Sequence, residues 1–310
     1  MKKIFLYVAL SSLLLGACSD DSENLNINTK GVELTIQASI ANPSDTRTAY
    51  ERLESGMNVD WEATEKLLVV SFNESGITAV DDFTSTGEAG RKEASFSGTW
   101  NGKAGDKVIC LYPADKSMFS ATIGSTSIAF TYAEHSPFKN IVTLKNWDVM
   151  IGDVTIDGDN SSVLLSRKTA VLDFAFSGAH AWDYDWLYHV QQMGVSAYSG
   201  SNPVLFANAG TIATTTSTYT GEIVASSYQP DYRKAFDVNL TNEGVYHYYY
   251  PVVANGTLNA GDEIRFNYYV SERSGYSSTD KYSNSKTKTL KSSFTITPGK
   301  IYKVGEVGLY

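Results

Sequence analysis

Short stretches in which apolar and polar residues alternate recur along this chain, and turn-forming residues separate them. The first stretch, Val32–Ile40 (VELTIQASI), places an apolar side chain at every second position, and Pro43, Ser44 and Asp45 follow it closely. A period of two is that of a β-strand with one buried face and one solvated face. The pattern therefore favours a chain built from strands and turns.

Further segments carry the same signal, and tyrosine and glycine are abundant while helical periodicity is scarce. They are Lys66–Phe72, Ala94–Trp100, Lys107–Tyr112, Ser127–Tyr132, Ala170–Phe176, Val190–Tyr198, Tyr246–Val253, Glu263–Val270, Ser292–Thr297 and Ile301–Leu309. The alternation in the last segment changes parity near Gly305, as at a β-bulge. Regularly spaced short strands predict an all-β chain of packed β-sandwiches.

One aromatic segment fits two structures. Trp182, Trp186 and Val190 share a face if residues 179–194 form a helix. If the segment is a strand, Trp182, Tyr184, Trp186, Tyr188 and Val190 share a face, and the aromatic composition favours this structure. Most of these side chains are then expected to pack in a core or a loop.

The N-terminus has the layout of a bacterial secretory signal. Lys2 and Lys3 precede an apolar run that is too short to span a membrane as a helix. Residues 15–18 (LGAC) resemble a lipobox, the site where a lipoprotein is cut before a cysteine that receives lipid. We therefore expect residues 1–17 to be removed and Cys18 to be lipidated. An ordinary signal peptide with an incidental cysteine is the alternative.

The remaining chain has 293 residues, since 310 minus 17 is 293, and Cys110 is then its single cysteine. An intramolecular disulfide is excluded, and Cys110 is expected to be a buried apolar residue of a strand. Loss of Lys2 and Lys3 changes the formal net charge from −9 to −11. A phosphate backbone would be repelled, so nucleic acid is not an expected partner.

Sequence signatures of enzymes and metal sites are missing. The chain has no G-x-S-x-G elbow, no P-loop and no H-E-x-x-H pair, and its four histidines are dispersed. The stretch from Asp157 superficially resembles a calcium loop, but Lys168 stands where that loop needs a glutamate. We expect no catalytic residues, no cofactor and no metal.

Several motifs stand in an order that resembles the fimbrillin-like proteins of Bacteroidetes, over nearly the whole chain. After the lipobox they are Thr46–Thr48 (TRT), Val59–Val70 (VDWEATEKLLVV), Phe96–Trp100 (FSGTW), Leu111–Asp115 (LYPAD), Asp148–Gly152 (DVMIG), Arg167–Phe176 (RKTAVLDFAF), Tyr248–Val253 (YYYPVV) and Thr297–Leu309 (TPGKIYKVGEVGL). Asp20, Asp21 and Glu23 behind Cys18 also resemble the acidic tag that exports lipoproteins to the surface of the outer membrane. A merely solvated tether would have the same composition.

The resemblance implies two transthyretin-like β-sandwich domains in tandem and a non-enzymatic subunit of a type V pilus that serves cell adhesion. Such precursors travel as lipoproteins, are trimmed at an arginine and polymerise by strand exchange with other pilus subunits. The matching bond here is Arg47–Thr48, so Val32–Ile40 would be a removable strand. The alternative is a permanent first strand beside an incidental arginine.

These expectations divide the chain into five parts. They are a signal peptide (1–17), a lipidated propeptide (18–47), a first sandwich (48–150), a junction in the Gly/Asp/Asn/Ser cluster (151–162) and a second sandwich (163–310). The fimbrium and the outer membrane surface are the expected locations, with a host or bacterial surface receptor as a further partner. The alternative function is a monomeric surface lipoprotein that stacks sugar rings on Trp182, Tyr184, Trp186 and Tyr188.

Overall fold

A computed structural model gives the fold of the chain. The residues it describes are 31–41, 61–87, 92–133, 141–158, 161–177, 186–229, 234–240, 245–254, 256–274 and 277–308. Regular structure in these ranges is almost entirely β-strand, with one 3-10 helix, η1 (Ile141–Trp147). The prediction of an all-β chain is confirmed. Within the same ranges, no helix has the length and apolar character needed to cross a membrane.

The strands of the first half close into a barrel. In order around it they are β1 (Val32–Ile40), β4 (Glu93–Trp100), β3 (Gly76–Ser85), β2 (Lys66–Asn73), β5 (Lys107–Tyr112), β8 (Met150–Thr155) and β9 (Ser162–Arg167). The sequence predicts a β-sandwich over 48–150, and the difference arises because β1 pairs with β4 along one edge and with β9 along the other. The transthyretin-like form of the two halves stays a prediction.

The second half is a sandwich of two sheets. One sheet holds β21 (Ile301–Gly308), β10 (Thr169–Ser177), β16 (Val245–Ala254), β13 (Phe206–Ala213), β7 (Ser127–Thr131), β6 (Phe119–Ser120) and β14 (Val224–Tyr228). The other holds β12 (Asn202–Pro203), β11 (Trp186–Ser199), β18 (Glu263–Ser274), β19 (Ser277–Thr289) and β15 (Lys234–Leu240), and β17 (Gly256–Leu258) pairs with β20 (Phe294–Ile296). Phe174 and Phe266 stack across the shared core, with ring centroids 4.4 Å apart.

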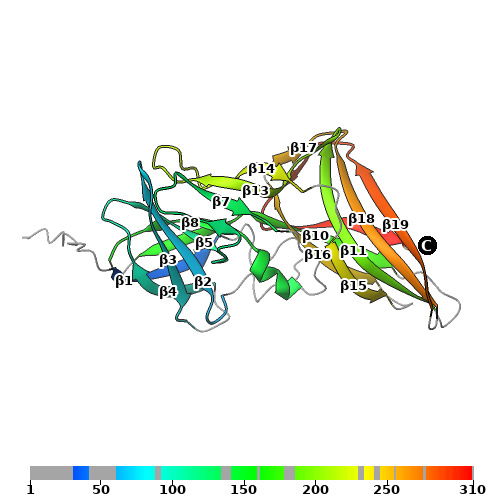
Figure 1. Cartoon of the computed structure of the whole chain (residues 1–310), viewed down its shortest axis with the longest axis horizontal. Coiled ribbons are helices and arrows are strands. Elements are labelled where there is room, and N and C mark those ends of the chain that lie inside the picture. The colour runs from blue at the N-terminus through cyan, green and yellow to red at the C-terminus, as the bar shows by residue number, and fades with distance from the viewer. Residues whose placement is uncertain are drawn as a thin grey trace, which may run out of the picture.

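Two short strands of the first half belong to a sheet of the second half. β6 and β7 lie between β5 and β8 in the sequence, yet β7 pairs antiparallel with β13. This ladder runs from Thr131 opposite Ala209 to Ser127 opposite Ala213. Figure 1 shows β7 and β13 between the barrel strands and the long strands β11, β18 and β19. Main-chain hydrogen bonds therefore join the two halves.

β2 is buried on both faces because the sheet that contains β7 and β13 covers the outer side of the barrel. Leu67 and Val69 belong to the core inside the barrel, whereas Leu68 and Val70 share a second core with Phe130 of β7. These four side chains of β2 are fully buried. A strand that is covered on both faces has apolar residues at successive positions rather than at alternate ones, which explains the sequence LLVV.

The chain passes from the barrel to the next sheet at Lys168, between β9 and β10. The predicted junction at 151–162 covers most of β8 and the turn into β9, and both strands belong to the barrel. The Gly/Asp/Asn/Ser cluster thus marks a turn between neighbouring strands of one barrel, as its composition also permits.

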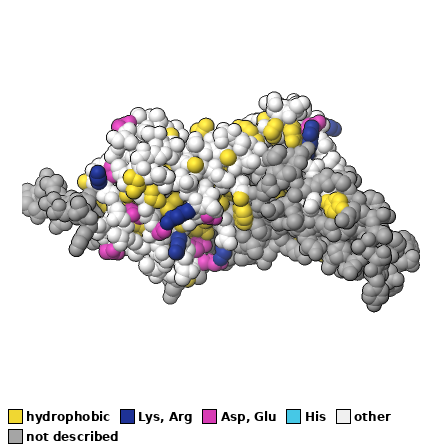
Figure 2. All heavy atoms as spheres, in the orientation of Figure 1, with side chains coloured by type: hydrophobic (Ala, Val, Ile, Leu, Met, Phe, Trp, Pro, Cys, Tyr) yellow, Lys and Arg dark blue, Asp and Glu magenta, His cyan; other side chains and the backbone are white. Residues whose placement is uncertain are grey.

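Charged side chains of both signs are mixed on the surface of the barrel. Lys116 pairs with Asp82 at 2.9 Å, and Lys107 pairs with Asp153 at 3.0 Å. Figure 2 shows basic and acidic side chains beside one another on the described part of one face. The net negative charge of the chain is therefore not gathered on this part of the surface.

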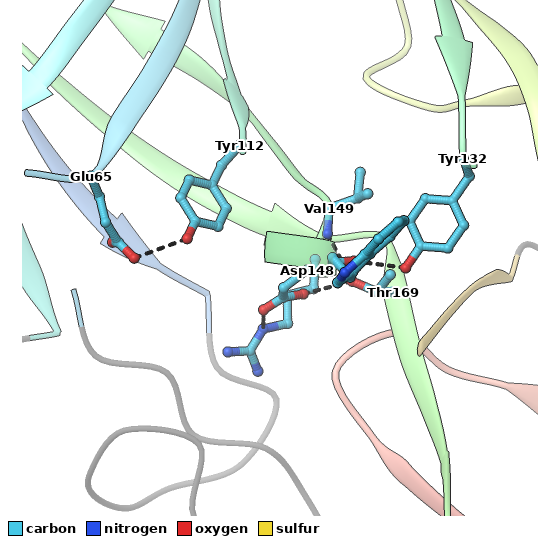
Figure 3. A network of polar contacts seen from close by, with 8 residues as sticks. Glu65, Tyr112, Tyr132, Asp148, Val149 and Thr169 are labelled. Carbon is cyan, nitrogen blue, oxygen red and sulfur yellow. Dashed lines mark hydrogen bonds and ion pairs between the residues drawn. The ribbon is translucent and has the colours of Figure 1, made fainter. Parts of the chain in front are cut away.

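A buried polar network lies where the chain leaves the barrel (Figure 3). Arg167 Nε donates to Asp148 Oδ2 at 2.9 Å, and each of these side chains is only 2% exposed. Thr169 Oγ1 donates to Asp148 Oδ1 at 2.6 Å and accepts a hydrogen bond from the Val149 amide at 3.0 Å. The network connects the end of β9, the start of β10 and the segment after η1.

We expect Arg167→Met to lower the free energy of unfolding by about 3–5 kcal/mol, because it leaves the Asp148 carboxylate buried without its cation. The matched control is Lys116→Met, which removes an exposed ion pair and should cost about 1 kcal/mol or less. Denaturant unfolding of the two variants measures both values. Equal losses would contradict a structural role for the buried pair.

Candidate functional site

β1 is paired along both of its edges. It runs antiparallel to β4 from Val32 opposite Trp100 to Ser39 opposite Glu93. It runs parallel to β9 over its last four residues, which lie opposite Ser162 to Leu165. Two further bonds extend this second ladder, since Gln37 N donates to Ser161 O and Ala41 N donates to Leu165 O, both at 2.8 Å. β1 therefore closes the barrel.

The inward face of β1 fills the barrel core. Leu34, Ile36, Ala38 and Ile40 are between 0% and 9% exposed. They share one core with Phe96 of β4 and with residues of β5, β8 and β9. A fully buried leucine or isoleucine contributes about 1.5–3 kcal/mol relative to an exposed one, so this face holds β1 by several kcal/mol.

The outward face of β1 forms a row of side-chain hydrogen bonds with β4. Thr99 Oγ1 donates to Glu33 Oε1 at 2.6 Å, and Ser95 Oγ donates to Gln37 Oε1 at 3.0 Å. Between them, the Thr35 and Ser97 hydroxyls lie 2.8 Å apart. A slip of one residue would turn every apolar side chain of β1 outward, so the row and the buried face specify the same register.

The groove between β4 and β9 that β1 fills is the candidate functional site, and it is called the β1 groove below. Without β1, both flanking strands would present unpaired main-chain groups, and Phe96, Val163 and Leu165 would lose part of their cover. Exposed strand edges beside an apolar surface readily pair with another chain. The groove can therefore hold one extended segment, in one direction and one register.

Gly31 directly precedes β1 and lies close to the end of β4. A Cβ atom at this position would lie 2.3 Å from Thr99 Cγ2 and 2.6 Å from Asn101 Oδ1. A side chain there requires both neighbours to shift, so the close approach of β1 to the end of β4 favours glycine.

The predicted processing residues flank β1 and lie outside the described residues. Cys18 precedes Gly31, and Arg47 and Thr48 follow Ala41, the last described residue before position 61. The position of the strand agrees with its prediction from alternation, since β1 spans Val32–Ile40. Lipidation and cleavage stay predictions.

The aromatic residues of the alternative function are only partly placed. Trp182 and Tyr184 lie outside the described residues. Trp186 and Tyr188 belong to β11, opposite Ser274 and Glu272 of β18, which agrees with the strand rather than the helix for this part of the segment. Their role in sugar binding stays a prediction.

Two further predictions about strands are confirmed. β21 pairs parallel with β10, and its register shifts where Lys303 lies opposite Asp173 and Gly305 lies opposite Phe174, so the bulge is present. Cys110 is fully buried in β5, and burial raises the pKa of its thiol far above the ordinary value. A thiol held neutral in a core is a poor nucleophile.

Comparison with known proteins gives similar structures but no similar sequences. No family model and no curated protein matches the chain. A proposed cell adhesion protein of Parabacteroides distasonis is 13% identical, with a TM-score of 0.48, over 91% of this chain and 89% of its own. A fimbrial protein of Bacteroides vulgatus is 13% identical, with a TM-score of 0.35, over 89% of this chain and 95% of its own.

The fimbrial anchor protein Mfa2 of Porphyromonas gingivalis is 9% identical, with a TM-score of 0.32, over 76% of this chain and 78% of its own. Identities and TM-scores this low do not transfer a function, so the site has to be interpreted from its own geometry.

We expect Ile36→Ala to lower the free energy of unfolding by about 2–5 kcal/mol, because it removes a fully buried side chain from the barrel core. The neighbouring change Gln37→Ala alters the exposed face of the same strand and should stay within about 0.5 kcal/mol. Denaturant unfolding compares the two. Similar small losses would show that β1 contributes little to the barrel.

Proposed function

We propose that the chain is the precursor of a type V pilus subunit in which a strand of another subunit replaces β1. The observation that supports this most is the pairing of β1 along both edges, with four inward side chains in the barrel core. A strand held in this way completes a monomer, and its removal creates a specific binding groove. The function is assembly and adhesion, without catalysis.

The geometry limits what can replace β1. An incoming strand has to run antiparallel to β4 and parallel to β9, which fixes its direction. It also needs apolar side chains at alternate positions to match Leu34, Ile36 and Ile40. Main-chain hydrogen bonds then add directionality to the burial of apolar surface.

Processing after Arg47 is the step that frees the groove in this proposal. The released segment, residues 18–47, contains Asp20, Asp21, Glu23, Glu33 and Asp45 against Lys30 and Arg47. Its formal charge is −3, so its loss changes the charge of the chain only from −11 to −8. Apolar burial in the groove, rather than charge, drives assembly.

The lipid on Cys18 would hold the precursor at the outer membrane until that cut. One acyl chain binds a membrane only reversibly, whereas two or three give stable anchoring. Lipid and first strand lie on the same segment, so one cleavage after Arg47 removes both. Release from the membrane and opening of the groove would then be coupled.

The test is to treat membranes that carry the precursor with an arginine-specific protease. We expect a 263-residue subunit, since 310 minus 47 is 263, that begins at Thr48, leaves the membrane fraction and forms SDS-resistant oligomers. The retained fragment should show an acylated Cys18 by mass spectrometry. N-terminal sequencing identifies the first residue of the subunit, and light scattering measures its oligomeric state.

Two variants control this experiment. Arg47→Ala should stay membrane-bound and monomeric, whereas Arg52→Ala, which changes a nearby arginine, should be processed normally. If the chain cut after Arg47 remains a stable monomer even with other pilus subunits present, strand replacement is the wrong account of this groove.

A further inference from the structure

The buried side chains of β1 differ in size, and Ala38 is the small one. Among the four buried positions of this face, the other three hold leucine or isoleucine. Ala38 is 0% exposed, and it lies opposite Ala94 in the ladder with β4 and opposite Val163 in the ladder with β9. All three residues belong to the barrel core. Two alanines therefore face the barrel interior side by side.

Trp61 supplies the volume that this pair of alanines lacks. A close-packed interior leaves little empty space, so small residues on facing strands are matched by a large side chain from elsewhere. Among the described residues, Trp61 is the largest side chain that is fully buried, and it belongs to the same core. Its ring meets Phe96 edge-on, with centroids 4.9 Å apart. Phe96 is the next inward residue of β4 after Ala94, so the indole lies close to this layer of the core.

The other side of Phe96 is already occupied by a different ring. Gly98 is the following inward position of β4, and a Cβ atom there would lie 2.9 Å from Phe83 Cδ2. Phe83 is fully buried and therefore covers the space beside Gly98. The space on the Ala94 side of Phe96 is the one left for Trp61.

The second aromatic neighbour of Trp61 lies at the same end of the barrel. Tyr112 is the last residue of β5, and its ring meets Trp61 edge-on with centroids 5.4 Å apart. Tyr112 lies opposite Met150 of β8, and Met150 lies opposite Arg167, the last residue of β9. β1 also ends beside this part of β9, with Ile40 as its last residue. Trp61 therefore fills the end of the barrel at which β1 finishes.

We infer that the strand which replaces β1 has to carry alanine or glycine where β1 has Ala38, because the indole of Trp61 takes the space in front of that position. Larger aliphatic residues belong at the neighbouring inward positions, 36 and 40. This requirement rests on the proposed function and specifies the partner strand by the order large, small, large at alternate positions. A segment with large apolar residues at all three positions is excluded even where its alternation is correct.

The intact chain tests the size limit without any exchange of strands. Ala38→Leu should lower the Tm by about 3–10 °C, because additional methyl and methylene groups in a packed core are destabilising. The matched control is Gln37→Leu, which adds a leucine to the solvated face of the same strand and should shift the Tm by about 2 °C or less. An Ala38→Leu variant that melts with the unchanged protein would overturn the size limit.

A second change tests the role of Trp61. Trp61→Leu makes room in front of position 38, so the double variant with Ala38→Leu should lose less Tm than the sum of the two single losses. Trp61→Phe, which keeps an aromatic ring beside Phe96, repeats this comparison with a milder change. Fully additive losses in both comparisons would overturn the role of Trp61.

Peptide retention extends the test to an exchanged strand. After cleavage behind Arg47, β1 is held without a covalent link, and an excess of labelled peptide of residues 31–41 can replace it. The Ala38→Leu peptide should dissociate at least about fivefold faster than the unchanged peptide, whereas the Gln37→Leu peptide should stay within about twofold of it. Equal retention of all three would overturn the size requirement alone. Failure of every peptide to enter the groove would overturn the proposed strand replacement, and this requirement with it.

Discussion

The pairing of β1 with both β4 and β9 is the constraint on which the first half of the molecule depends. It turns a curved sheet into a closed barrel and supplies four of the side chains in the barrel core. Val171 and Tyr249 of the second half are buried in that same core. A change in β1 therefore affects packing on both sides of the boundary between the halves.

The rest of the architecture ties the two halves into one body. β7 joins the barrel to the sheet of β13, and the Asp148–Arg167 pair with Thr169 fixes the point where the chain crosses over. β1 belongs to neither of these two connections, so the proposed loss of β1 would leave both of them in place. A groove that keeps its shape when its first occupant leaves can bind a second one in the same register.

Local patterns in the sequence predicted the strands better than their partners. Alternation gave the bounds of β1, and the parity change near Gly305 gave the bulge in β21. β9 has no clear signal in the sequence, because Leu164 is 57% exposed and interrupts the pattern of its buried neighbours Val163 and Leu165. The role of β7 as a bridge to β13 has none either, since pairing between distant segments leaves no local signal. The candidate site was thus predicted as a strand, and only the fold supplied its groove.

The structure of the assembled filament, determined by electron cryomicroscopy, tests the central claim most directly. Residues 18–47 should be absent, and a strand of a neighbouring subunit should lie between β4 and β9, antiparallel to β4 and parallel to β9. Density for the chain's own Val32–Ile40 in that position, still connected to residue 48, would contradict it.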